Sequence, residues 1–272
     1  MNESTVIALG FFDGVHIGHG ALLRRVGEIA RREGYLPAAL TFDHHPKDFI
    51  PGAGHIPLLN TPADREELMH RLYGTKADLK NLDLNQLRAC SYSMMRAKRI
   101  PHVMGVEEEA VKLAQRWGAD PELARRAGIL HDCTKYYELP EQLDICEEYG
   151  VRLDALEQKA VKLLHSKTGA CIARGVFGQP DAVYDAIFWH TTGKADMTTL
   201  EKVLYIADYM EPNRDFDGVE RLRHLAYTDL DKAMLLGAEM TIQEMQQRQV
   251  PIHKNTLQAR DWLRQHGVTT ED

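Results

Sequence analysis

Histidine and aspartate recur at five places along the chain, and each place ends or lines a segment with helical periodicity. One histidine sits in the apolar stripe of residues 153–174, and another directly follows the apolar run 186–189. Burying such polar side chains in a helical core is costly unless something compensates them. The six residues are His102, His131, Asp132, His165, His190 and Asp208. Imidazole and carboxylate groups together suit divalent first-row cations, so the pattern predicts a helical domain built around a metal centre.

Each of these residues, taken alone, has a plainer explanation. A buried histidine is more often a hydrogen-bonded core residue than a ligand, and an aspartate late in a helix can be a simple polar contact. The joint pattern decides between the two interpretations. His131 and Asp132 close the amphipathic segment 123–130, which places both at the inner end of a helix, and the remaining residues lie on other predicted helices.

The composition sets limits on the class of protein. At 272 residues and 30.9 kDa, with 44% hydrophobic and 27% charged residues, the chain has enough apolar side chains for two small domains. The net charge of -7 and the pI near 6.0 argue against a broad nucleic-acid-binding surface. A small anionic substrate remains compatible with this charge, because bound cations reverse the local field.

The cysteines and the first residues indicate the compartment. Cys90, Cys133, Cys146 and Cys171 form neither a CxxC pair nor a disulfide framework. The start has no signal-peptide pattern, and no window approaches eighteen uninterrupted apolar residues. We therefore expect a cytoplasmic protein that has no membrane partner.

The periodicities predict a mainly α protein with a small partial α/β unit at the start. A strand over residues 5–9, a helix over 21–32 and a strand over 36–42 form a β-α-β unit with a parallel pair. A loop over 46–60 and a helix over 62–73, capped by Thr61 and stopped by Gly74, follow. The predicted organisation is a partial α/β unit over 1–75, a linker over 76–90 and an all-helical domain over 91–272.

Few segments beyond Gly74 alternate with a period of two, so the rest of the chain is expected to be all-α. The predicted helices cover residues 84–98, 105–117, 121–131, 139–149, 153–174, 180–189, 198–210, 218–226, 228–247 and 253–265.

The residues around the six candidate ligands resemble the HD superfamily of metal-dependent phosphohydrolases. The resemblance covers about residues 91–263 and rests on RIPHVMGV at 99–106, AGILHDCTK at 127–135, HS at 165–166, HTTG at 190–193 and KVLYIADYMEPNR at 202–214. HD proteins in general share only the first, second and last of these ligand motifs. The two middle histidines, the Thr-Thr-Gly and the Glu-Pro-x-Arg make the sequence similar to the YqeK-like branch, the symmetrical bis(5'-nucleosyl)-tetraphosphatases.

This resemblance implies a dinuclear centre held by the six residues, with Asp132 as the bridge between two divalent ions. Iron is expected, with manganese, cobalt or zinc as alternatives. The implied reaction is hydrolysis of diadenosine tetraphosphate at its central anhydride to two ADP. Asp132 and Lys135 are the candidate catalytic residues. The candidate substrate contacts are Lys135, Thr191, Thr192, Gly193 and Arg214, although solvated cations and a helix C-cap at Gly193 explain these residues too.

A second motif stands at the start, where GFFDGVHIGH at 10–19 joins a strand to a helix. His16 and His19 of this HxGH signature would face nucleotide phosphates at the helix N-terminus. Residues 4–74 resemble the FAD synthetase branch of the nucleotidyltransferases, but only the first half of that fold is predicted. A two-stranded parallel sheet cannot cover both of its faces unaided. We therefore expect a degenerate nucleotide-binding appendage or a piece that docks onto the helical domain.

Three further functions stay open beside the leading hypothesis. The same centre suits a phosphomonoesterase or phosphodiesterase acting on another nucleotide. The HxGH segment suits adenylyl transfer, and the whole chain suits a catalytically silent nucleotide sensor. The expected partner is a small dinucleoside polyphosphate rather than a nucleic acid, and a homodimer is left open.

Overall fold

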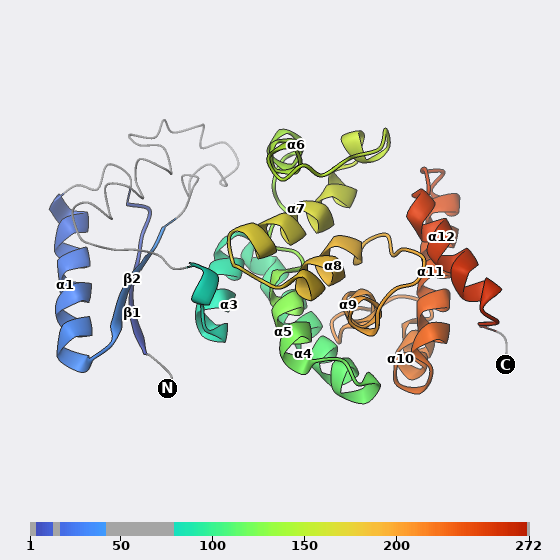
Figure 1. The fold of residues 1–272 in the computed structure, drawn as a ribbon, viewed down its shortest axis with the longest axis horizontal. Coiled ribbons are helices and arrows are strands. Elements are labelled where there is room, and N and C mark those ends of the chain that lie inside the picture. The colour runs from blue at the N-terminus through green and yellow to red at the C-terminus, as the bar shows by residue number, and fades with distance from the viewer. Residues whose placement is uncertain (1–3, 13–16, 42–78, 271–272) are drawn as a thin grey trace. The chain divides into compact units, whose positions relative to one another are not determined.

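The computed structural model describes residues 4–12, 17–41 and 79–270. The chain divides into two compact units, Met1–Asp78 and Leu79–Asp272 (Figure 1). The predicted loop over 46–60, the predicted helix over 62–73 and His16 lie outside the described residues. Among the described residues, no helix has the length and apolar character that a membrane crossing requires.

The first unit contains the predicted β-α-β arrangement. Strand β1 (Thr5–Leu9) pairs in parallel with β2 (Leu36–Leu40), and helix α1 (Ile17–Glu33) connects them. Ala8, Phe12, Leu23 and Val26 form a small buried cluster between the sheet and this helix. The prediction of a small partial α/β unit is confirmed, because the described part of this unit contains two strands.

The second unit is all-helical, as predicted. Its helices are α3 (Leu84–Ser93), α4 (Ile100–Trp117), α5 (Pro121–Leu130), α6 (Leu139–Glu148), α7 (Val161–Gly175), α8 (Asp181–Trp189), α9 (Thr199–Met210), α10 (Val219–Thr228), α11 (Leu230–Gln247) and α12 (Lys254–Gln265). Short 3₁₀ turns cover Leu79–Asn81, Ala97–Arg99 and Glu157–Lys159. Most helices begin and end within two residues of the predicted positions.

The segment predicted as a linker, residues 76–90, overlaps the helix predicted to begin at residue 84, and the structure describes residues 79–90 of it. Residues 79–90 belong to the helical unit, and Leu87 of α3 is fully buried in its core. Asp83 caps this helix by accepting hydrogen bonds from the backbone of Asn85 and Gln86, and Gln86 accepts one in return. The helix predicted over 84–98 is therefore present from Leu84, but it ends at Ser93.

Helix α4 begins at Ile100 instead of the predicted residue 105. Pro101 occupies the first turn, where its missing N–H is not needed. The earlier start matters for the site, because it places Arg99 at the cap and His102 in the first turn of the helix.

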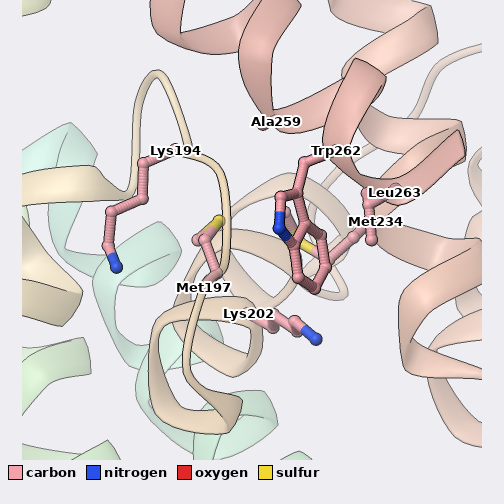
Figure 2. A pocket seen from close by; sticks show the side chains of 7 residues that line it. All are labelled: Lys194, Met197, Lys202, Met234, Ala259, Trp262 and Leu263. Carbon is pink, nitrogen blue, oxygen red and sulfur yellow. The ribbon is translucent and has the colours of Figure 1, made fainter. Parts of the chain in front are cut away.

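The centre of the helical unit is a close packing of α4, α5, α8 and α9. Gly128 of α5 makes this possible, since a Cβ atom there would lie 2.8 Å from the Cα of Glu107 on α4. Helices α11 and α12 close the far side of α9. Figure 2 shows the place where Met197, Met234 and Trp262 meet; the cavity between them is about 10 Å³, which admits at most one water molecule.

A buried charge network ties α7 to the start of α12. Glu157 Oε1 lies 2.5 Å from Lys167 Nζ on α7 and 3.1 Å from Nε2 of His253, the cap residue of α12. Lys254 Nζ lies 3.1 Å from the carboxylate of the neighbouring Asp154. Because lysines already supply positive charge to both carboxylates, this cluster fixes α7 without needing an ion. Burial opposes ionisation of Glu157, but bonds from His253 and Lys167 outweigh it and lower its pKa to about 2.

We expect the stability of the helical unit to depend on Glu157 at low pH. Its folded-state pKa lies below the ordinary value of 4.5, so its contribution is fully present above pH 4.5 and is lost as the pH falls toward 2. Glu157→Gln leaves Lys167 without its anionic partner and should lower the free energy of unfolding at pH 7 by about 3 kcal/mol. Guanidinium unfolding at pH 7 and pH 3 measures both effects.

The matched control is Glu147→Gln, which removes an exposed carboxylate from α6. It should change the free energy of unfolding by less than about 0.5 kcal/mol. An equal loss in both variants, or a pH dependence that Glu157→Gln leaves intact, would contradict the role of the buried network.

Candidate metal centre

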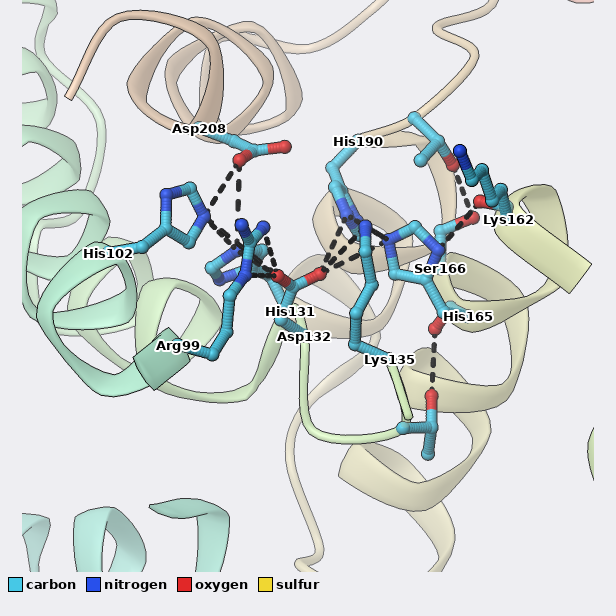
Figure 3. Close-up of polar contacts among 12 residues, drawn as sticks. Arg99, His102, His131, Asp132, Lys135, Lys162, His165, Ser166, His190 and Asp208 are labelled. Atoms are coloured by element: carbon cyan, nitrogen blue, oxygen red, sulfur yellow. Dashed lines mark hydrogen bonds and ion pairs between the residues drawn. The ribbon is translucent and has the colours of Figure 1, made fainter. Parts of the chain in front are cut away.

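The six residues singled out by the sequence converge on one point inside the helical unit (Figure 3). They come from five helices or helix ends, so the fold brings together residues that are far apart in the chain. His102 lies in the first turn of α4, His131 caps α5, and Asp132 follows it; His165 lies on α7, His190 caps α8, and Asp208 lies near the end of α9. The structure therefore assembles the predicted set completely.

His102, His131 and Asp208 form one group. His102 Nε2 lies 3.0 Å from Asp208 Oδ1 and 3.4 Å from His131 Nε2, and His131 Nε2 lies 3.9 Å from Asp208 Oδ1. Ligand atoms that share one ion at about 2.1 Å lie about 3.0–3.4 Å apart when the angle at the ion is near 90–110°. Two of the three separations in this group lie in that range, and the third, 3.9 Å, requires a wider angle at the ion.

Asp132, His165 and His190 form the second group. His165 Nε2 lies 3.1 Å from Asp132 Oδ1 and 3.2 Å from His190 Nε2, and His190 Nε2 lies 4.0 Å from Asp132 Oδ1. The other carboxylate oxygen of Asp132 faces the first group, 3.5 Å from His131 Nε2 and 3.8 Å from His102 Nε2. Asp132 thus presents one oxygen to each group.

The backbone fixes which nitrogen of each ring points inward. Nδ1 of His131, His165 and His190 lies 2.7 Å from the carbonyl oxygen three residues earlier in its own helix. A carbonyl only accepts, so each Nδ1 carries the proton and each Nε2 presents a lone pair to the centre. Burial, the largest influence, lowers the pKa of all three rings to about 4, so they are neutral at pH 7.

His102 is held differently, by a side chain. Its Nδ1 lies 3.0 Å from Oε1 of Glu211, which is buried and also accepts hydrogen bonds from the backbone and side-chain nitrogens of Asn213. Gly105 makes room for this carboxylate, because a Cβ atom at that position would lie 2.5 Å from Glu211 Oε2. A carboxylate that orients a metal-binding histidine is a common outer contact of metal sites.

These donors fit divalent metal ions. Lone pairs of four imidazoles and two carboxylates face one another inside a buried pocket, and such groups repel unless a cation stands among them. Asp132 Oδ1 is fully buried, and no donor in the described part of the chain reaches it with hydrogen-bond geometry. Burial would raise the pKa of Asp132 and Asp208, but the surrounding histidines, with Lys135 beside Asp132, hold both well below the usual range.

Three cationic side chains point at this concentration of acceptors. Arg99 donates to Asp132 Oδ2 at 2.6 Å, and Arg214 donates to Asp208 Oδ1 at 2.9 Å. Lys135 Nζ lies 2.9 Å from His165 Nε2 and 3.5 Å from Asp132 Oδ1. Sequence reasoning selected Lys135 and Arg214 but gave no role to Arg99 or Glu211. Both lie inside the motifs quoted above, each three residues from a candidate ligand, and that position marks them as candidates although it does not reveal their partners.

The predicted contacts at 191–193 separate into two kinds. The Thr191 hydroxyl donates to Ser166 at 2.6 Å and lines a cleft beside the centre. Gly193 has a φ of +65° and its N–H donates to the Trp189 carbonyl, so it closes the turn that follows α8, whose C-cap is His190. Thr192 is buried; its hydroxyl donates to the Gly193 carbonyl, and its own carbonyl accepts from the Thr256 hydroxyl. The packing accounts for Thr192 and Gly193, and their role toward a substrate stays a prediction.

The N-terminal motif is only partly described. The His19 ring on α1 packs edge-on against Phe12, with 5.1 Å between the ring centroids. Because His16 lies outside the described residues, the predicted phosphate-facing pair stays a prediction.

Comparisons with known proteins agree with both resemblances. The FAD synthetase family model matches residues 1–77, and the HD domain model matches residues 99–213. A symmetrical bis(5'-nucleosyl)-tetraphosphatase from Bacillus subtilis is 36% identical over 176 residues, 64% of this chain and 94% of that protein. A protein of the same name from Halalkalibacterium halodurans is 39% identical over 160 residues, 58% of this chain and 85% of that protein.

A solved structure is also similar. A predicted HD superfamily hydrolase involved in NAD metabolism, from Clostridium acetobutylicum, has a TM-score of 0.66 and 36% sequence identity, and the match covers 68% of this chain and 98% of that one. The helical unit and its histidine–aspartate centre are those of an HD-domain protein. Within that class, the chain belongs to the family of the symmetrical bis(5'-nucleosyl)-tetraphosphatases.

We expect Gly105→Ala to weaken metal binding although alanine is the better helix former. The new Cβ atom would displace the Glu211 carboxylate that orients His102. Loss of such an outer contact lowers metal affinity by about 10- to 100-fold. Competition for Mn²⁺ or Co²⁺ with a chromophoric chelator measures the change.

Gly27→Ala is the matched control, since the added Cβ on α1 would meet only Arg31 at 3.6 Å. Its metal affinity should equal that of the parent protein. Unchanged affinity in Gly105→Ala would show that Glu211 does not hold His102 for metal binding.

Proposed function

We propose that this chain hydrolyses diadenosine tetraphosphate at its central anhydride bond and releases two ADP molecules. The observation that carries the proposal is the meeting of six ligand-type residues in two groups that share Asp132. Membership in the bis(5'-nucleosyl)-tetraphosphatase family supports the substrate class. The second-ranked function is hydrolysis of another nucleotide phosphate at the same centre.

The proposed cofactors are two divalent ions, with iron first and manganese, cobalt or zinc as alternatives. His102, His131 and Asp208 would hold one, and His165 and His190 would hold the other. Asp132 would contribute to both through its two oxygens. Divalent ions, when bound, lower the pKa of a coordinated water so that it can act as a nucleophile, and they neutralise charge on phosphate oxygens. The protein's own part is to keep the rings neutral and aimed inward, which the helix carbonyls do for three of the four.

The cations around the centre suit a polyphosphate. Two divalent ions held by two aspartates keep only about two net positive charges, fewer than the four negative charges of a tetraphosphate bridge, so further positive groups within reach favour its binding. Arg99 and Arg214 offer planar forks that match phosphate oxygens, and Lys135 offers a mobile point charge. Each now contacts a carboxylate or imidazole of the centre, so each is within side-chain reach of a phosphate bound there.

The decisive experiment identifies the products. Protein purified without oxygen and loaded with Fe²⁺ or Mn²⁺ should convert diadenosine tetraphosphate into ADP alone. Ion-exchange chromatography of samples taken during the reaction identifies the products. Removal of the metal by a chelator should abolish turnover, and the added ion should restore it. Equal amounts of ATP and AMP would show asymmetric attack and would contradict the proposal. Absence of turnover together with rapid hydrolysis of a mononucleotide would favour the second-ranked function.

The N-terminal unit raises adenylyl transfer as a separate candidate, because the FAD synthetase family model matches residues 1–77. Pyrophosphate release from ATP and FMN tests it directly. We expect none above background, since the described part of the unit holds only two strands of a parallel sheet. Robust release that a His16→Ala, His19→Ala double variant loses would reverse this expectation.

Lys135→Gln should raise KM for diadenosine tetraphosphate about tenfold and leave kcat within about threefold. The reason is that Lys135 is proposed to attract the polyphosphate while ions hold the reacting water. Steady-state kinetics over a range of salt concentrations checks this, because the variant should also show a weaker dependence of KM on salt.

The control for Lys135 is Lys162→Gln, which removes an exposed lysine from the first turn of α7. Its kinetics should match those of the parent. If Lys135→Gln instead lowers kcat more than 100-fold at constant KM, Lys135 donates a proton to the leaving phosphate rather than binding the substrate.

A further inference from the structure

A large cleft opens beside the metal centre, between α9, the segment 211–217 and α11. Its volume is about 710 Å³, within the range of small-molecule sites. His190, Asp208, Thr191 and Arg214 line the end nearest the centre. The metal centre alone does not need this space, because its six ligand atoms lie within a few ångströms of one another.

The lining of the cleft combines three kinds of side chain. The candidate ligands His190 and Asp208 stand with the Thr191 hydroxyl and the Arg214 guanidinium; the second kind is the aromatic rings of Tyr205, Tyr209 and Phe216, with Met240. The third kind is hydrogen-bonding side chains from α11: Thr241, Gln243, Glu244 and Gln247. A nucleotide has matching parts, namely charged phosphates, a flat base and a hydrogen-bonding base edge.

The aromatic stretch is built as a platform. The rings of Tyr205 and Tyr209 are nearly parallel, at 11° with 6.2 Å between centroids, and Phe216 stands edge-on to Tyr209 at 87° and 5.5 Å. The Thr241 hydroxyl bonds to the Tyr209 hydroxyl at 3.3 Å and ties the platform to α11. Tyr209 and Phe216 are only half-buried, so their rings also face the cleft. Half-exposed rings held at fixed angles are suited to stacking with a flat base.

We propose that this cleft is the nucleoside subsite of the enzyme, in which the base stacks on Tyr209 and Phe216 and its amino group donates to Glu244. The inference rests on the proposed function for the identity of the phosphate end, since Asp208 and Arg214 mark where the phosphates enter. It goes further by assigning the base platform and the residue that selects among bases.

Glu244 is the residue of the third kind that can read a base. Its carboxylate accepts one hydrogen bond, from Arg248 on the same helix at 2.8 Å to Oε1, and a carboxylate has capacity for more. A carboxylate accepts from the exocyclic amino group of adenine, guanine or cytosine, and it gives no such bond to a base that lacks the group.

Direct binding to Mn²⁺-loaded protein tests the platform without requiring turnover. Phe216→Ala should weaken ADP about tenfold in isothermal titration and leave inorganic tripolyphosphate unchanged, because tripolyphosphate has no base to stack. Phe216→Leu keeps the packing volume and should show most of the same loss. Tyr184→Ala, which removes a half-buried aromatic ring from α8 outside the cleft, should leave both ligands unchanged.

The outcomes of this titration separate the two proposals. A loss of ADP binding in Phe216→Ala supports the subsite even if the parent protein fails to cleave diadenosine tetraphosphate. An ADP affinity within twofold of the parent, or an equal loss for ADP and tripolyphosphate, overturns the subsite even if symmetrical cleavage is observed. Melting curves of each variant identify any loss that comes from unfolding.

A second titration tests Glu244. The parent should bind ADP about tenfold more tightly than purine riboside diphosphate, which differs by the missing amino group. Glu244→Met should reduce this preference to about twofold or less. Arg248→Met breaks the same surface ion pair from its other end and should keep the preference. A preference that survives in Glu244→Met, or that falls equally in both variants, overturns the assignment.

Discussion

The mutual repulsion of six inward-facing electron pairs is the constraint on which the helical unit depends. Four imidazole nitrogens and two carboxylates meet in a pocket where His131, Asp132 and His190 are almost fully buried. Nothing but positive charge makes such a meeting favourable, and the surroundings provide it in the form of Arg99, Lys135 and Arg214. The cations, the buried glutamate and the close helix packing all follow from holding these groups together.

Helix geometry does most of the positioning. His131 and His190 cap their helices, where the ring turns back to a carbonyl of the last turn and leaves its other nitrogen pointing away from the helix. Glycines then let the helices approach: Gly128 brings α5 against the backbone of α4, and Gly105 admits Glu211 behind His102. The same arrangement leaves one side of Asp208 facing the cleft. A ligand in that cleft and the ions would therefore share a wall.

Much of this could be predicted from the sequence, because the signals are local. Helix positions follow from apolar periodicity, and the six polar residues stand out against it, so their convergence was predictable before any coordinates. Two features of the structure could not be predicted in this way. The helix at Leu84–Ser93 was predicted, but its packing was not, because Leu87 is recognised as a core residue only when its partners are known. The role of Glu211 depends on a contact with His102 across more than a hundred residues, which no spacing reveals.

Histidine rings oriented by the main chain and a histidine ring oriented by a side chain respond differently to amino-acid replacement during evolution. Three of the histidines are oriented by main-chain carbonyls, which every amino-acid sequence supplies, so replacements around them leave their aim intact. His102 is oriented by a replaceable side chain and by the absence of another at Gly105. Among the four histidines, the aim of the ring is therefore adjustable at His102 alone, and divergence in the orientation of the imidazoles among related proteins should begin with the partners of His102.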